Sequence, residues 1–171
     1  AMWATRLNTR YPNDPAVVAS LLLNHVILSA GEALYLDPGN LHAYLSGTGV
    51  EVMGSSDNVV RCGLTNKHVD VNELLATVVP QPLPDPILRA VPVAKTEAGR
   101  LWKYETPDTP FTLWVHQIDG TETLRARTRE LTLCGVGATN LLHRGEVCYL
   151  APGEEITLHG KATLFRVTEN S

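Results

Sequence analysis

The chain has 171 residues, of which 44% are hydrophobic and 19% are charged, as in an ordinary globular protein. This composition excludes wholesale disorder, a collagen-like chain and a coiled coil. The formal net charge of -4 argues against a broad nucleic-acid interface, because such an interface needs clustered basic side chains. The longest aliphatic run, residues 16–23, is too short to cross a membrane. We therefore expect no nucleic-acid partner and no membrane segment.

The first residues predict a cytoplasmic protein, because they lack the basic and apolar regions of a secretory signal. Ala1 before Met2 suggests a cloning remnant ahead of the initiator methionine. The three cysteines are an odd number and form no CxxC motif. In a cytoplasmic chain they are expected to be reduced thiols.

A short helix is predicted at residues 15–23, where Asp14 can cap the free N–H groups and Pro15 suits the first helical position. The pattern then changes to short apolar runs separated by turn residues, which is typical of an all-β sandwich or barrel. The runs predicted to be strands are 26–28, 33–36, 42–45 and 50–53.

A second helix is predicted to begin at Asp70 and to end before Pro80, because Asp70 and Glu73 have the spacing of a capping box. Five of the eleven prolines fall between residues 80 and 92. Their fixed φ angles and missing N–H donors exclude a helix or a central strand. We therefore expect a proline-rich linker over residues 80–98.

The rest of the chain, residues 99–171, is predicted to form a second all-β domain, because short apolar runs again alternate with glycines. The expected strands are 111–118, 130–134, 147–150, 156–159 and 162–167. The expected fold is mainly β with two short helices, and the first domain covers residues 1–79.

An internal repeat relates the two domains. Residues 28–39 match residues 142–153 at a constant offset of 114, with seven identities in twelve positions. The match predicts two copies of one barrel-like domain, with equivalent strand units at residues 25–53 and 139–167. At the same offset His42 becomes Ile156 and Tyr44 becomes Leu158, so the second copy lacks this polar pair.

His42 is the first candidate site residue, because strand alternation would put His42 and Tyr44 on one face. An imidazole beside a phenol on the inner face of a barrel suits a metal ion or a sugar. The alternative is a core histidine without a ligand role. The repeat favours a functional role, since Ile156 fills the equivalent position. The other histidines match no metal-binding motif and are predicted to be structural: His25, His68, His116, His143 and His159.

Charged residues that follow His42 are further candidates. Glu51 suits either a hydrogen bond to a sugar or exposure to solvent. Arg61 and Lys67 flank a glycine-containing turn, where a planar fork and a point charge suit a phosphate or an ene-diolate. The alternative for these two cations is plain solvation at the surface. Between these positions, residues 55–58, which include Asp57, are predicted to be a loop.

The segment from His42 to Lys67, HAYLSGTGVEVMGSSDNVVRCGLTNK, closely resembles the second signature of type I mannose-6-phosphate isomerases. That family has alanine where this chain has Gly54 and Cys62, and proline where it has Asn66. These differences leave the charged positions in place. Similar segments flank the signature: 16–24, 31–33 and 111–167. The resemblance covers essentially the whole chain, as the C-terminal part of a longer enzyme.

This resemblance implies a cupin architecture of jelly-roll, double-stranded β-barrels. It also implies an enzyme of carbohydrate metabolism, which catalyses the zinc-dependent isomerisation of mannose 6-phosphate to fructose 6-phosphate. His42 takes the role of a zinc ligand, and Arg61 and Lys67 become catalytic residues that also bind the phosphorylated hexose. Tyr44 and Glu51 would line the same substrate pocket. A Lewis-acidic metal and nearby cations suit an ene-diol reaction, because they stabilise charge that develops on oxygen.

The family takes three further zinc ligands from segments upstream of the helix at 15–23, namely a glutamine, a histidine and a glutamate. Residues 2–13 contain none of these types. A catalytic zinc normally needs three protein ligands, so we expect a truncated form that is inactive alone and holds zinc weakly or not at all. The alternatives are a metal-independent cupin that binds a sugar phosphate or has a structural role, and an enzyme completed by another chain.

The incomplete first domain also predicts association. Absent strands would leave unpaired N–H and C=O groups beside an apolar face. Because every copy carries the same edge, we expect a homodimer through residues 2–79. The alternative is a monomer whose first domain rearranges.

Overall fold

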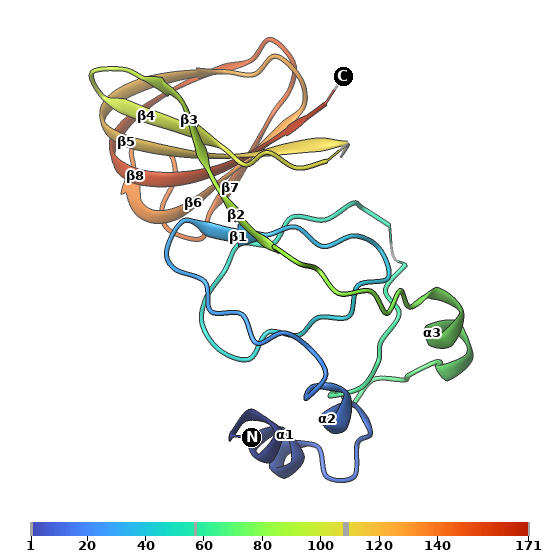
Figure 1. Ribbon diagram of the computed structural model, residues 1–171. Helices are drawn as coiled ribbons and strands as arrows, with labels where there is room; N and C mark the ends of the chain where they lie inside the picture. Colours follow the sequence, from blue (N-terminus) through green and yellow to red (C-terminus); the bar gives the residue numbers. More distant parts are fainter. Residues whose placement is uncertain (1, 57, 108–109, 171) are drawn as a thin grey trace. The chain divides into compact units, whose positions relative to one another are not determined.

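The computed structural model describes residues 2–56, 58–107 and 110–170, and the chain divides into two compact units. The first unit holds residues 1–29, 34–49 and 55–86, and the second holds residues 30–33, 50–54 and 87–171. Figure 1 shows that loops dominate the first unit and strands the second. None of the helices in the described ranges is long and apolar enough to span a membrane.

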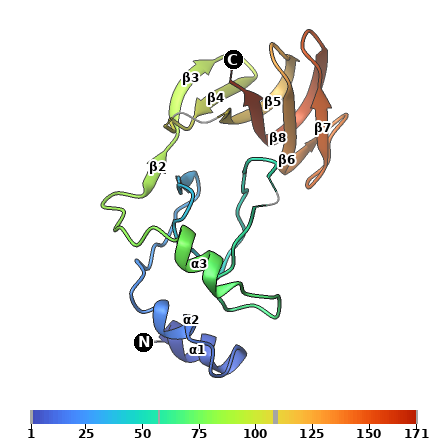
Figure 2. The same cartoon turned by 90° about the vertical axis from the view of Figure 1, so that its right-hand side faces the viewer.

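The helix predicted near Asp70 is confirmed as α3, Val71–Thr77. Asp70 Oδ1 accepts a hydrogen bond from the Glu73 N–H at 3.0 Å, and the helix ends before Pro80. An additional helix, α1, spans Met2–Arg10 and was not predicted. It packs beside α2, as Figure 2 shows.

Helix α2 is shorter than the helix predicted at residues 15–23. It spans Ala16–Ala19, and its N-cap residue is Pro15, which makes no side-chain capping bond. Asp14 Oδ1 accepts a hydrogen bond from the Ala16 N–H at 2.9 Å. Val17 is buried, whereas Leu22 beyond the helix is 86% exposed. The apolar run therefore packs at its start and lies on the surface at its end.

Most strands predicted in the first half are absent from the described residues. The run 33–36 contributes to β1, Glu32–Leu34, which pairs with β2, Ile87–Arg89, in a two-stranded sheet. Residues 42–45 and 50–53 have no regular secondary structure and are largely exposed, and no strand forms at 26–28. A strand must satisfy its N–H and C=O groups through a neighbour, and these runs have no ladder partner in the described residues. The prediction of equivalent strand units at 25–53 and 139–167 is wrong for its first half.

The internal repeat is nevertheless visible in the geometry of one turn. Turns 37–40 and 151–154 each have glycine in the third position, with φ of 87° and 89°. Only glycine adopts this left-handed conformation easily. In both turns the last side chain accepts a hydrogen bond from the N–H of the first residue, at 3.0 Å to Asn40 Oδ1 and 2.7 Å to Glu154 Oε2. The repeat in sequence is thus a repeat in local structure.

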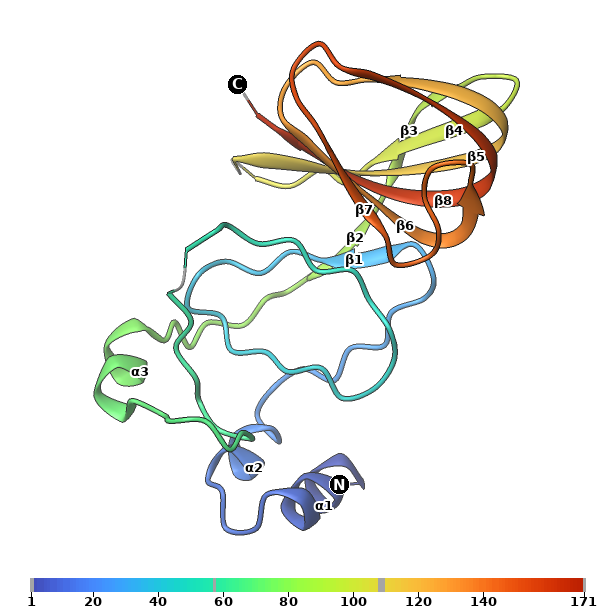
Figure 3. The same cartoon turned by 180° about the vertical axis from the view of Figure 1, so that it is seen from behind.

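The second unit is built on a six-stranded antiparallel sheet of order β3-β4-β5-β8-β6-β7. Its strands are β3 Val91–Lys95, β4 Gly99–Lys103, β5 Phe111–Arg125, β6 Glu130–Thr139, β7 Val147–Leu150 and β8 Glu155–Glu169. The sheet curls around one face, as Figures 1 and 3 show from opposite sides. Every run predicted as a strand after residue 110 lies in a strand, and the mainly β fold class is confirmed.

Four glycines that were expected to separate strands lie inside them instead, namely Gly120 in β5, Gly135 and Gly137 in β6, and Gly160 in β8. Gly120 in β5 is paired with Gly160 in β8, and their φ angles are 132° and 146°. A Cβ on Gly160 would lie 2.5 Å from Ala138 O in the neighbouring β6. Glycine at these positions lets two long strands bend at a point where backbones approach closely.

The segment 80–98, expected to be a linker, contains β2 and β3, and residues 87–98 belong to the second unit. β3 is an edge strand, where the missing N–H of Pro92 is tolerated, and its pairing with β4 shifts between Pro92 and Ala94. The prolines exclude a central strand but not an edge strand. The division into 1–79, 80–98 and 99–171 stays a prediction.

Burial is concentrated in the second unit. Its core cluster consists of Ile118, Leu124, Cys134, Leu142, Leu158, Ala162 and Leu164. Within the described part of the first unit, Ala16 and Val17 are the buried hydrophobic residues. Among the residues that the structure describes, the hydrophobic core cluster therefore lies in the second unit.

Candidate functional site

The structure brings His42 and Tyr44 together. Their rings form a T-shaped pair with centroids 6.4 Å apart, and Tyr44 is 76% exposed. His42 Nδ1 lies 3.0 Å from Asn40 O. Because a carbonyl only accepts, Nδ1 carries the proton in this contact and Nε2 keeps its lone pair. Histidines that bind metals are commonly oriented in this way by a backbone carbonyl.

Arg61 and Lys67 flank a turn that is held against the start of α2. The Leu64 N–H donates a hydrogen bond to Asp14 Oδ2 at 2.7 Å, and Gly63 and Leu64 have φ of 147° and 53°. A Cβ on Gly63 would overlap the beginning of α2. Asp14 therefore hydrogen-bonds both to the first residue of α2 and to the turn. Arg61 next to this turn is half-buried, whereas Lys67 is exposed.

The joint position of the five predicted site residues stays a prediction. Glu51 is exposed and belongs to the second unit, whereas His42, Tyr44, Arg61 and Lys67 belong to the first. The predicted loop 55–58 has no regular secondary structure at Ser55, Ser56 and Asn58, and Asp57 lies outside the described residues.

The described residues do not fit a zinc site. Across 2–56, 58–107 and 110–170, no group of three or more histidine, cysteine, aspartate or glutamate side chains is placed to hold a metal ion. His42 offers a single imidazole, and a catalytic zinc normally has three protein ligands. The described side chains therefore do not supply zinc chemistry by themselves.

A buried charged network in the second unit was not predicted from the sequence. Arg166 in β8 donates to both carboxylate oxygens of Glu130 in β6, at 2.6 and 2.9 Å, and their side chains are 12% and 1% exposed. Thr132 Oγ1 also donates to Glu130 Oε1 at 2.8 Å. Arg166 Nη1 lies 3.4 Å from His116 Nδ1. Both charges are thus paired and hydrogen-bonded, as burial of charge requires.

His116 is held neutral within this network. Burial lowers its pKa most strongly and the charge of Arg166 lowers it further, whereas Glu122 and Glu130 oppose this shift. A guanidinium only donates, so Nδ1 accepts and Nε2 carries the ring proton. The sequence holds no signal for the network. The alternation over residues 130–133 predicts that Leu131 faces the core, whereas the structure buries Glu130 and leaves Leu131 50% exposed.

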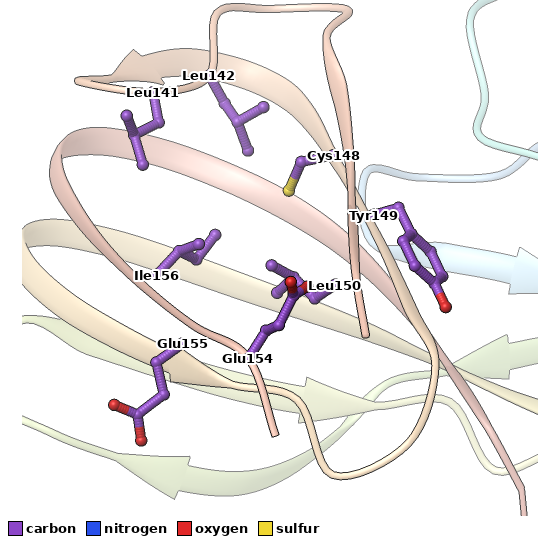
Figure 4. Close-up of a pocket in the computed structure, with 8 residues that line it drawn as sticks. All are labelled: Leu141, Leu142, Cys148, Tyr149, Leu150, Glu154, Glu155 and Ile156. Atoms are coloured by element: carbon purple, nitrogen blue, oxygen red, sulfur yellow. The ribbon is translucent and has the colours of Figure 1, made fainter. Parts of the chain in front are cut away.

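A cavity of about 350 Å³ lies in the second unit where the repeat places the counterpart of the His42 region. Leu142, Cys148, Leu150 and Ile156 gather around it, as Figure 4 shows. Ile156 stands at the position equivalent to His42, so this wall is apolar. Burial raises the pKa of the Cys148 thiol, and Glu130 raises it further, which leaves a weakly nucleophilic thiol at neutral pH.

The curled antiparallel sheet of the second unit has a cupin-type architecture, and comparisons with known proteins show which proteins of this fold the chain resembles. The chain is 34% identical over 167 residues to mannose-6-phosphate isomerase of Escherichia coli (strain K12), covering 92% of this chain and 42% of that protein. It is 35% identical over 162 residues to the Rattus norvegicus enzyme, covering 94% of this chain and 37% of that protein. No protein-family model matches the chain.

A solved structure gives the same result. Mannose 6-phosphate isomerase from Salmonella typhimurium, bound to substrate (f6p) and zinc, matches with a TM-score of 0.70 and 29% identity, over 98% of this chain and 45% of that one. The predicted resemblance to mannose-6-phosphate isomerases, as the C-terminal part of their sequence, is confirmed. The chain spans less than half the length of each of these relatives.

Proposed function

We propose that this chain forms part of a mannose-6-phosphate isomerase, which interconverts mannose 6-phosphate and fructose 6-phosphate. The supporting observation is the 34% identity to the Escherichia coli relative across 92% of the chain. Because the chain spans 42% of that relative, the activity is proposed for an assembly that also contains the remaining portion of the isomerase sequence.

Arg61 and Lys67 are proposed to act on the phosphorylated hexose in different ways. The isomerisation moves a proton between adjacent carbons through an ene-diolate, whose negative charge a fixed cation stabilises. Arg61 is half-buried beside the turn that Asp14 fixes, so its guanidinium suits this role. Lys67 is exposed and suits the phosphate as a mobile point charge.

His42, Tyr44 and Glu51 complete the proposed contribution of this chain. His42 would offer Nε2 to a zinc ion, because Nδ1 is bonded to Asn40 O. Tyr44 and Glu51 would line the substrate pocket. The other zinc ligands would have to come from the remaining portion, since the described residues form no metal-binding group. We therefore expect the chain alone to hold no stoichiometric zinc and to show no isomerase activity.

The test compares the chain alone with the chain mixed with a polypeptide that matches the rest of the Escherichia coli relative. We expect bound zinc and isomerase activity only in the mixture. In the active mixture, Arg61→Ala should lower kcat by at least about 100-fold, as expected when one charge-stabilising group is removed. Lys67→Ala should mainly raise KM, and Lys95→Ala, an exposed lysine of β3, is the matched control.

Two results would overturn the proposal. A mixture that folds and binds zinc but does not isomerise mannose 6-phosphate contradicts the proposed reaction. Isomerase activity or one tightly held zinc in the chain alone contradicts the need for a second portion.

The second candidate is a metal-independent cupin that binds a sugar phosphate or has a structural role. One observation favours the structural role, namely the apolar cavity wall at Ile156, the position equivalent to His42. Binding of fructose 6-phosphate by the chain alone after chelation of metals would support this candidate.

A further inference from the structure

A second cavity of the second unit, of about 220 Å³, is lined by residues of β3, β4, β5 and β8. Thr96, His116, Glu122 and Arg166 provide its polar wall, and Leu101 and Leu124 contribute apolar surface. The volume lies below the roughly 300–1,000 Å³ of pockets for drug-sized ligands, so it suits a molecule of the size of a monosaccharide or smaller.

Gly99 in β4 is buried and forms the floor of this cavity. A Cβ added to Gly99 would overlap Glu122 Oε1 and come within 3.0 Å of His116 Nε2. These two atoms therefore face the same point above the glycine. The space they share is open only because residue 99 has no side chain.

The two groups have complementary hydrogen-bonding roles. Arg166 occupies Nδ1 of the neutral His116 ring, so Nε2 presents an N–H donor to the cavity. Arg166 itself is fixed by its two hydrogen bonds to Glu130. Glu122 is an acceptor that receives a hydrogen bond from Thr96 Oγ1, and its second oxygen adds further acceptor capacity.

The charge balance disfavours an anionic ligand. Arg166 is neutralised by Glu130, and Arg125 at the edge of the cavity lies 3.4 Å from Glu155. Glu122 has no cationic partner among its described contacts, which leaves the cavity with one negative charge. A phosphate or carboxylate would be repelled, whereas a hydroxyl group can both accept from Nε2 and donate to the carboxylate.

We propose that the second unit binds an unphosphorylated sugar or polyol in the cavity above Gly99. His116 donates to one hydroxyl and Glu122 accepts from the same or the neighbouring hydroxyl. The C–H face of the ligand packs on Leu101 and Leu124. This site is made entirely by the second unit, so it does not depend on the isomerase activity proposed above.

The direct test is titration of the full chain with D-mannose, D-fructose and D-mannitol, and separately with inorganic phosphate, followed by NMR of backbone amides. We expect saturable shifts at Thr96, Gly99 and His116 with at least one neutral probe and none with phosphate. A lack of saturable shifts with all three neutral probes, or shifts at these residues with phosphate alone, overturns the proposal.

Substitution of Gly99 tests whether the sugar or polyol binds in this cavity or elsewhere on the protein. Gly99→Ala fills the space between His116 and Glu122 and should weaken binding at least about tenfold. Gly54→Ala makes the same chemical change where nothing lies within 4 Å, and it should leave binding unchanged. If Gly99→Ala fails to fold, Glu122→Gln gives a second measure, because it weakens the acceptor without changing its shape. Unchanged affinity in the folded variants contradicts the proposed site.

Discussion

His116 couples the stability of the second unit to pH. In the folded unit its pKa lies below the ordinary value of about 6.5, because burial and then the charge of Arg166 disfavour the protonated ring, against the opposing influence of Glu122 and Glu130. As the pH falls through the ordinary value, the unfolded chain binds a proton that the folded unit does not. The free energy of unfolding should therefore fall, by at most about 1.4 kcal/mol per pH unit. The contribution of neutral His116 to the free energy of unfolding is fully present above the ordinary pKa. It is lost as the pH falls from that value towards the lower pKa of the folded unit.

Urea unfolding between about pH 7.5 and about pH 5.5 checks this prediction. The indole signal of Trp114 reports on the second unit, since its Nε1–H donates to Thr168 Oγ1 at 2.9 Å. We expect His116→Gln to depend less on pH than the parent chain. His143→Gln, at an exposed position, is the control and should keep the parent's dependence. Identical pH dependence in parent and His116→Gln would show that another group is responsible.

Individual side chains were predictable where their partners are close in sequence. Asp70 caps α3 through Glu73, three residues away, and Asp14 accepts from the N–H of Ala16 at the start of α2. The pair Arg166–Glu130 spans 36 residues and forms only after β6 and β8 have paired. Sequence patterns carry no information on such a partner. Of the proposed isomerase site, the contact of His42 with Tyr44 is seen here, and the convergence of all five residues stays a prediction.

At the scale of elements, Gly137 determines how closely β6 approaches β8. Its φ is 76°, and an added Cβ would overlap Lys161 O in β8. Gly145 has a similar φ of 90° but open space around it. Gly145→Ala should lose roughly 1–2 kcal/mol of unfolding free energy, because an L-residue disfavours the left-handed region. Gly137→Ala should lose clearly more, since the backbone of β8 must also move.

Urea unfolding of the two alanine variants, followed by the same Trp114 signal, measures this difference. Both variants carry the same change of residue and a similar change of backbone preference, so the comparison isolates the steric contact with β8. Equal losses of unfolding free energy in the two variants would contradict the steric explanation.

The strands of the second half were predictable, and most of those of the first half were not, although both halves show the same pattern. Every residue of β5 pairs with a residue of β8. These two alternating segments therefore satisfy each other's backbone hydrogen bonds within the chain. Residues 42–45 and 50–53 have comparable alternation but no ladder partner in the described residues. Alternation indicates that a segment can form a strand, and pairing decides whether it does.

At the scale of the whole chain, the two units differ in how they bury apolar side chains. The second unit has a continuous core around Leu158 and Leu164, both fully buried. The first unit exposes many of its large hydrophobic residues, among them Val18, Leu21, Leu22, Ile27 and Leu75. Contiguous apolar patches mark interaction sites, so we expect these side chains to contribute to one. Local unfolding should therefore begin in the first unit.

The exposed apolar surface predicts that the chain associates through its first unit. A second copy carries the same surface, so the expected product is a symmetric homodimer through residues 2–79. Light scattering after size exclusion should give about twice the 18.6 kDa of one chain at high concentration. Leu22→Glu and Ile27→Glu, at positions 86% and 78% exposed, should shift the mass towards one chain. Gln117→Glu, at an exposed position of β5 in the second unit, adds the same charge outside the first unit and should leave the dimer intact.

The same experiment connects association with the proposed isomerase. If the apolar surface of the first unit normally packs against the remaining portion of the enzyme, then a polypeptide matching that portion should compete with the second copy. Its addition should convert the homodimer into a complex of one chain with one such polypeptide, and Leu22→Glu should weaken both assemblies together. A mass of 18.6 kDa at all concentrations rules out the homodimer. A homodimer that persists unchanged beside an active complex would show instead that the two partners use different surfaces.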